Sequence, residues 1–102
     1  MLSLSTANSR AYIFRAELYS GMGRTEDSIV DAKRAIQLLS ASSSENVSLL
    51  VKAYRLLADI HEQAGNWSAA MEALQSVAAS NPSLRTKITK EVERLKQRAA
   101  SS

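Results

Sequence analysis

Apolar residues recur along this chain every three or four positions, the spacing that places them on one face of an α-helix. The run Leu84, Ile88, Val92 and Leu95 shows it clearly, with Lys and Glu residues between. The pattern predicts an all-α fold of about five antiparallel helices, over residues 9–21, 25–40, 45–64, 67–79 and 82–98. Residues 1–8 are predicted to be a flexible start and residues 99–102 a frayed tail.

Glycine and asparagine residues separate the predicted helices. Gly23 and Gly65 should end the first and third helices, because glycine adopts the left-handed conformation without steric cost. Side-chain oxygens able to cap the helices that follow are found in Thr25, Asn66 and Asn81. The Ser-rich stretch 41–48 is predicted to be an insertion, either a longer loop or extended helix ends.

The first and second helix pairs align when one is shifted by 42 residues. Each copy consists of a helix, a glycine turn and a second helix. In this alignment Tyr12 corresponds to Tyr54, Ala16 to Ala58, Gly23 to Gly65 and Ala35 to Val77.

The second copy resembles the tetratricopeptide repeat (TPR). The resemblance is carried by Tyr54-x2-Leu57-Ala58-x2-His61, then Ala70-x3-Leu74, then Pro82. The first copy departs from the family, with Arg15 in place of the expected Leu and Ser28 in place of the expected Ala. The 42-residue spacing is also longer than the family's 34.

The resemblance implies a TPR-like domain over residues 9–98. Its parts would be a first repeat at about 9–40, a second at about 47–80 and a cap helix at about 82–98. It implies a non-enzymatic scaffold or adaptor that binds a peptide or another protein in a groove formed mainly by the first helix of each pair. The groove residues carried over from the family are Arg10, Ile13, Phe14, Glu17, Lys52, Arg55, Asp59 and Glu62.

A narrower hypothesis is a co-chaperone domain that clamps the carboxylate of a heat-shock chaperone tail. Lys52 matches one lysine of that clamp. Phe14 stands where the family has Asn, and Leu56 where it has Arg, with Arg55 one position away. A shift of one residue turns a helical side chain by about 100°, so the clamp should be altered or displaced.

Two further alternatives belong to other classes. If no repeat precedes the first pair, Tyr12, Phe14 and Ile29 would be exposed at the end of the stack and could support self-association. Weak RNA association is the other, because the net charge is +3 and the sequence pI about 9.5. The basic residues are interspersed with acids, which argues against nucleic acid as the partner.

The remaining composition points away from catalysis. The chain has no cysteine and a single histidine, His61, whose position matches an aromatic packing site. No Gly-rich phosphate loop or nucleophile elbow is present. We therefore expect no catalytic residue, no metal site and no cofactor. No apolar run is long enough for a membrane span, and we expect a cytoplasmic location, with the nucleus as the alternative.

Overall fold

The computed structural model describes residues 4–40 and 47–101, and these residues form helices without any strand. The all-α prediction is therefore confirmed for this part of the chain. The elements are α1 (Leu4–Gly21), α2 (Thr25–Ser40), α3 (Val47–Gln63), α4 (Trp67–Ser80), a short 3₁₀ helix η2 (Pro82–Leu84) and α5 (Arg85–Ser101).

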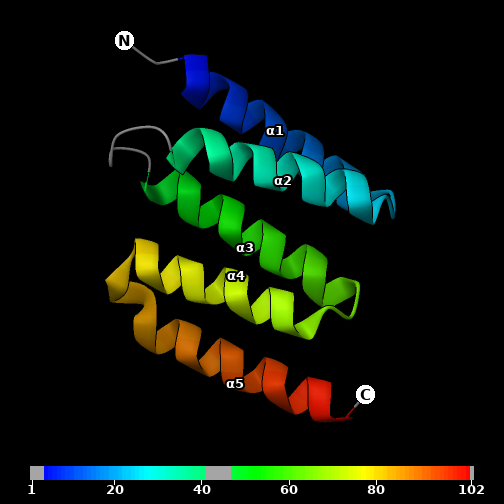
Figure 1. Cartoon of the computed structure of the whole chain (residues 1–102), viewed down its shortest axis with the longest axis vertical. Coiled ribbons are helices and arrows are strands. Elements are labelled where there is room, and N and C mark those ends of the chain that lie inside the picture. The colour runs from blue at the N-terminus through cyan, green and yellow to red at the C-terminus, as the bar shows by residue number, and fades with distance from the viewer. Residues whose placement is uncertain (1–3, 41–46, 102) are drawn as a thin grey trace.

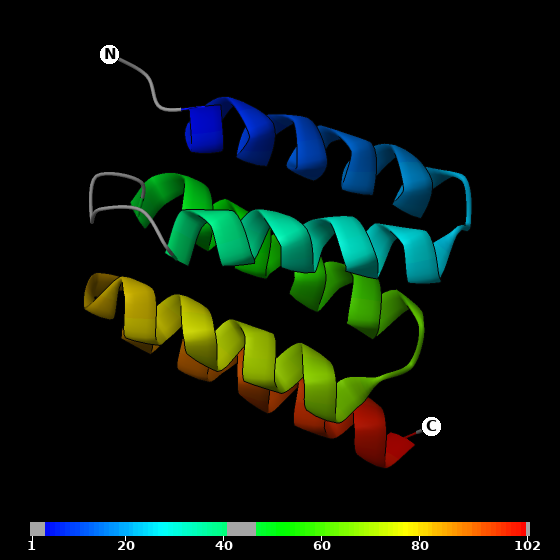
Figure 2. The same cartoon turned by 45° about the horizontal axis from the view of Figure 1, so that its top comes forward.

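The helices stack in chain order (Figure 1). α1, α3 and α5 run in one direction, and α2 and α4 return in the opposite direction. Figure 2 shows α3 behind α2 and α5 behind α4, so the odd and even helices form two offset layers. α3 packs against both α2 and α4, and it also contacts α1. The result is a flat stack with extents of 48 × 33 × 15 Å.

Two equivalent turns set the antiparallel geometry. Gly23 and Gly65 both have φ of 79°, which confirms the predicted left-handed conformation. At the first turn the Gly23 N–H donates to the Ser20 carbonyl at 3.1 Å, and the Arg24 N–H donates to the Tyr19 carbonyl at 2.9 Å. These two bonds define a Schellman motif.

The second turn repeats the same pair of bonds 42 residues later. The Gly65 N–H donates to the Glu62 carbonyl at 3.0 Å, and the Asn66 N–H donates to the His61 carbonyl at 2.8 Å. Each helix pair is therefore joined by the same type of turn, a Schellman motif with a left-handed glycine.

Several predicted boundaries need correction. α1 begins at Leu4, so helix extends into the stretch predicted to be a flexible start, and α5 continues to Ser101 through most of the predicted frayed tail. In both places the sequence contains neither Gly nor Pro to stop the helix. In the predicted insertion, residues 47 and 48 belong to α3, and residues 41–46 lie outside the described part.

The predicted caps also differ in outcome. Asn81 is confirmed, since its Oδ1 accepts a hydrogen bond from the Ser83 N–H at 3.3 Å. The Asn66 side chain makes no capping bond, and its φ of −88° and ψ of 73° lie outside the extended conformation that is typical of a capping residue. Thr25 is the first helical residue: the Ser28 N–H donates to the Arg24 carbonyl, so Arg24 occupies the capping position.

The core runs through the stack in two connected clusters. The larger consists of Ala16, Ala32, Leu57, Ala58, Ile60, Ala70, Ala73, Leu74, Val77, Ile88, Val92 and Leu95, and the smaller of Ile13, Ala35, Leu39 and Ala53. Five of the alanines are fully buried, and such small side chains allow helix axes to approach closely. Tyr54 and Trp67 pack against the larger cluster with part of each ring exposed.

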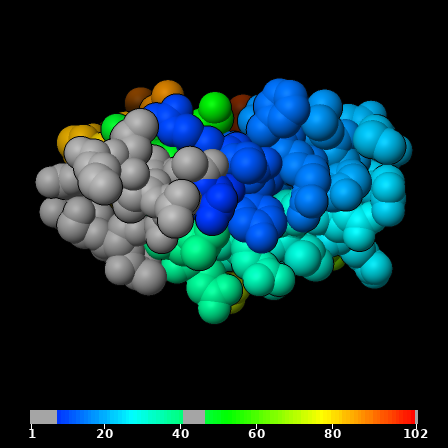
Figure 3. Space-filling model, turned by 90° about the horizontal axis from the view of Figure 1, so that it is seen from above, coloured from blue at the N-terminus to red at the C-terminus, as the bar shows by residue number. Residues whose placement is uncertain are grey.

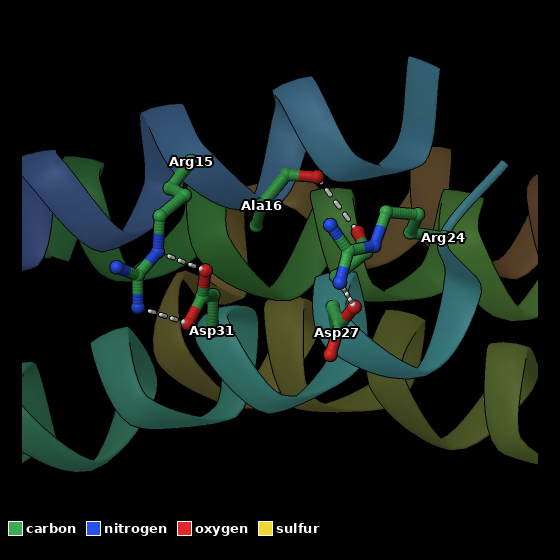
Figure 4. Close-up of polar contacts among 6 residues, drawn as sticks. Arg15, Ala16, Arg24, Asp27 and Asp31 are labelled. Atoms are coloured by element: carbon green, nitrogen blue, oxygen red, sulfur yellow. Dashed lines mark hydrogen bonds and ion pairs between the residues drawn. The ribbon is translucent and has the colours of Figure 1, made fainter. Parts of the chain in front are cut away.

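Arg15 and Ser28, two positions where the first copy differs from the repeat pattern of the second, form polar contacts between α1 and α2 (Figure 4). The buried Ser28 hydroxyl donates to the Ala16 carbonyl at 2.7 Å. Arg15 binds Asp31 through two bonds, Nε to Oδ2 at 2.7 Å and Nη2 to Oδ1 at 2.9 Å. Leu57 and Ala73 occupy the positions equivalent to this ion pair in the second copy, and both are buried. The first pair thus uses an ion pair where the second uses apolar packing.

Candidate protein-interaction surface

The layer of odd-numbered helices holds all the groove residues expected from the sequence. Arg10, Ile13, Phe14 and Glu17 lie on α1, and Lys52, Arg55, Asp59 and Glu62 lie on α3. α1 and α3 run in the same direction and touch each other (Figure 1). The structure therefore brings these two helices together, but it gives the eight side chains different surroundings.

Two of the α3 residues bind α5. The Arg55 guanidinium donates two hydrogen bonds to Glu91, at 3.1 and 3.0 Å, and both side chains are less than one-third exposed. Glu62 forms an ion pair with Arg98, one turn from the end of α5. Both pairs join residues 36 positions apart. Arg55 and Glu62 therefore hold α5 against α3, and neither side chain is free to contact a partner without breaking this attachment.

Asp59 lies between these two ion pairs and remains exposed. Partial desolvation raises the pKa of its carboxyl above the ordinary value of 3.8, and the nearby charge of Glu62 adds to this effect. Arg55 and Arg94 act in the opposite direction but do not cancel it. Ionising the Asp59 carboxyl therefore requires more free energy in the folded chain than in the unfolded one.

Arg10, Glu17 and Lys52 are exposed, as expected for a binding surface. Lys52 makes no ion pair with any other residue in the described ranges. Arg10 and Lys52 are equivalent in the 42-residue register, and so are Glu17 and Asp59. Two neighbouring parallel helices therefore each carry an exposed cation and, seven residues later, an exposed carboxylate.

Ile13 does not belong to this surface, which corrects the sequence prediction. Its side chain is 2 % exposed and packs in the smaller core cluster with Leu39 and Ala53. The helical period places Ile13 on the flank of α1 that the close approach of α3 covers. Leu56, which occupies the position expected for an arginine in the co-chaperone hypothesis, is half-buried and packs against both clusters.

The sequence predicted an exposed Phe14, but it did not predict that Leu18 on α1 and Met22, just past the end of α1, are exposed as well. Phe14, Leu18 and Met22 are 64, 51 and 65 % exposed. Figure 3 looks onto this end of the stack, where the side chains of α1 lie on the surface beside those of α2. Phe14 and Leu18 both lie on α1, the helix at this end of the stack. The 42-residue register could have identified Leu18, since it corresponds to Ile60, a core residue.

The other two residues expected at that end are less exposed than predicted. Tyr12 is half-buried, with the Arg15 and Arg34 guanidinium groups 5.5 and 5.9 Å from its ring centroid. Ile29 is half-buried and packs against the larger core cluster, so it faces the interior of the stack.

A cavity of about 440 Å³ lies where α4 begins beside the end of α5. Trp67, Arg94, Gln97, Arg98 and Ser101 line it. Arg98 stacks over the Trp67 ring at 5.5 Å while it pairs with Glu62. Arg98, one of the two cations that line this cavity, is therefore already engaged by two protein groups.

His61 is a buried polar side chain that takes no part in the surface described above. It is buried in α3, and its Nδ1 has no hydrogen-bond partner among the described residues. Burial lowers the pKa of the imidazole below 6.5, and the charge of Lys33 adds to this effect. Within residues 4–40 and 47–101, no group of three or more His, Cys, Asp or Glu side chains could hold a metal ion.

No protein-family model matches the chain, and no curated protein or solved structure matches it either. Among the described helices, none combines the length and the apolar character needed to cross a membrane.

Proposed function

We propose that this chain is a TPR-like, non-enzymatic module that binds an extended peptide segment of another protein along α1 and α3. The arrangement of four exposed charges carries the proposal. Arg10 and Lys52 lie nearer the N-terminal ends of two parallel helices, and Glu17 and Asp59 lie further along them. The surface thus has a basic end and an acidic end, and an extended peptide of complementary charge could lie between them.

The spacing of these charges sets a length for the peptide motif. Seven residues of α-helix rise about 10.5 Å, a distance that an extended peptide covers in about three residues. The preferred segment should therefore carry an acidic residue and a basic residue about three positions apart. The acid would bind beside Lys52 and the base beside Asp59.

A randomised peptide library selected on the purified chain tests this proposal. The selected sequences should share the acid–base spacing, and Lys52→Glu should weaken their binding by about tenfold. Lys90→Glu is the matched control, because Lys90 is also an exposed lysine but lies on α5, away from the proposed groove on α1 and α3. Arg55 is unsuitable as a test residue, since its reversal would also break the contact with Glu91.

Fluorescence polarisation of a selected peptide measures these affinities over a range of salt concentrations. Selection of peptides without a common charge spacing would contradict the proposal, and so would equal losses from Lys52→Glu and Lys90→Glu. The co-chaperone alternative has no comparable support: of its clamp positions Lys52 is exposed, while Leu56 is half-buried against the core clusters and Arg55 binds Glu91.

A further inference from the structure

Within residues 4–40 and 47–101, no helix covers the outer face of α1 in the way that α2 covers the equivalent face of α3. On α3, this face consists of Ala53, Leu56 and Ile60: Ala53 and Ile60 are buried in the core clusters that α3 shares with α2, and the half-buried Leu56 packs against both clusters. On α1, 42 residues earlier, the same face consists of Ala11, Phe14 and Leu18, all exposed. No helix in the described ranges packs over these three residues. The sequence therefore places on α1 an apolar surface of the kind that binds a helix elsewhere in the stack.

Two opposite charges flank the apolar stripe of Ala11, Phe14 and Leu18 on the same side. Arg10 immediately precedes Ala11, and Glu17 immediately precedes Leu18, so each charge has the same position relative to the stripe. Both side chains are exposed. The charges are seven residues apart, beyond the three- and four-residue separations at which helical side chains meet. They are therefore too far apart to neutralise each other within one helix.

We propose that a second copy of this chain covers the stripe, with the two α1 helices packed antiparallel about a two-fold axis. In the favoured register, Phe14 of each copy lies opposite Ala11 of the other, which pairs a large side chain with a small one. Arg10 of one copy then lies within about 3 Å, along the axis, of Glu17 of the other. The two-fold axis repeats this pair, so the interface contains two intermolecular ion pairs.

Charge also disfavours the neighbouring register. Sliding the helices by one heptad would place Phe14 opposite Leu18 of the second copy and bring the two Glu17 side chains together. Like charges at such a position oppose association, which is how flanking residues select the alignment of paired helices. The arrangement with complementary charges is therefore the one the sequence specifies.

A single pair of helices buries a small interface. Stable interfaces begin at about 1,200 Å² of total buried surface, and one helix face from each copy provides less than this. The dimer should accordingly be reversible and should depend on protein concentration. This inference goes beyond the peptide-binding groove, since it uses the outer face of α1. It shares Arg10 and Glu17 with the four charges of the proposed groove, and it assigns Phe14, expected in the groove from the sequence, to the dimer interface instead.

Sedimentation equilibrium of the 102-residue chain over a range of concentrations tests the apolar part of the proposal. The wild type should show reversible dimerisation, and Phe14→Glu should raise the dissociation constant by about tenfold or more. Val30→Glu is the matched control: Val30 is also exposed, at 58 %, but lies on α2. Lys52→Glu should leave dimerisation unchanged, which separates this proposal from the peptide-binding one.

A charge-swap cycle tests the register. Arg10→Glu and Glu17→Arg should each weaken the dimer, because each places like charges together, and the double swap should restore it. A chain that stays monomeric at all concentrations would overturn the proposal, as would a dimer insensitive to Phe14→Glu. A dimer that the double swap fails to restore would overturn the antiparallel register.

Discussion

The Arg15–Asp31 ion pair allows a test of how the first helix pair is held together. Its two ends have different access to water: the Asp31 side chain is 5 % exposed, whereas the Arg15 side chain is 55 % exposed. The hydrogen bonds to Asp31, together with its charge, raise the pKa of Arg15, which remains a cation at every accessible pH. Leu57 and Ala73 supply an apolar reference for the same positions in the second pair.

Removing Arg15 should lower the free energy of unfolding more than removing Asp31 does. Arg15→Leu leaves the Asp31 carboxylate buried without its cation, a state that costs about 3 kcal/mol of the free energy of unfolding. Asp31→Ala should cost much less, since the guanidinium it leaves behind already reaches water. The double substitution reproduces the Leu and Ala of the second pair and should be about as stable as Asp31→Ala alone.

Urea unfolding followed by circular dichroism measures all three variants. With a denaturant slope of about 1.5 kcal/mol per molar for a chain of this size, Arg15→Leu should lower the unfolding midpoint by about 2 M. Adding Asp31→Ala should recover most of this loss. Equal losses from the two single substitutions would refute the reasoning, and so would a double variant as unstable as Arg15→Leu.

The remaining predictions use the same unfolding measurement, and the one on Asp59 adds a peptide-binding measurement. The pKa of the buried His61 is lowered, so as the pH falls below 6.5 this imidazole is protonated in the unfolded chain before it is protonated in the folded one, and the free energy of unfolding decreases. His61→Leu should remove this decrease and add about 1 kcal/mol to the free energy of unfolding at neutral pH. The raised pKa of Asp59 means that its ionised form lowers stability, so Asp59→Asn should stabilise the chain at neutral pH, and the gain should vanish as the pH falls towards 3.8. The same substitution should weaken binding of the peptides proposed above, and unchanged affinity would remove this residue from the groove. Gly65→Ala should destabilise by about 1–2 kcal/mol because φ is positive there, whereas Gly21→Ala, where φ is not positive and no atom lies within 4 Å of an added Cβ, should be neutral or stabilising.

The features that depend on local sequence were predictable. α2 runs over the predicted residues 25–40, and both glycine turns adopt the expected conformation. Helix periodicity, glycine conformation and the Asn81 cap all arise within a few residues of chain, so a single sequence contains the information they need.

The features that depend on the rotation of one helix against another were not predictable in the same way. Arg55 and Glu91 are 36 residues apart, and only the packed stack shows that α5 turns its carboxylate towards α3. Ile13 and Glu17 lie one turn apart on neighbouring flanks of α1, yet the first is buried and the second exposed. The approach of α3 decides which flank is covered, and periodicity alone does not fix that approach.

The order of packing in the stack also has a consequence for folding. Helices that contact each other mainly follow each other in the chain, so few long loops must close before the core contacts form. Chains dominated by such local contacts fold within milliseconds or faster, and their ends open before their centre does. α3 packs on both sides, whereas α1 and α5 lie at the ends. Backbone amides of α3 should therefore exchange with solvent most slowly, and a unit consisting of α5 and its two ion pairs to α3 should open before the rest of the chain.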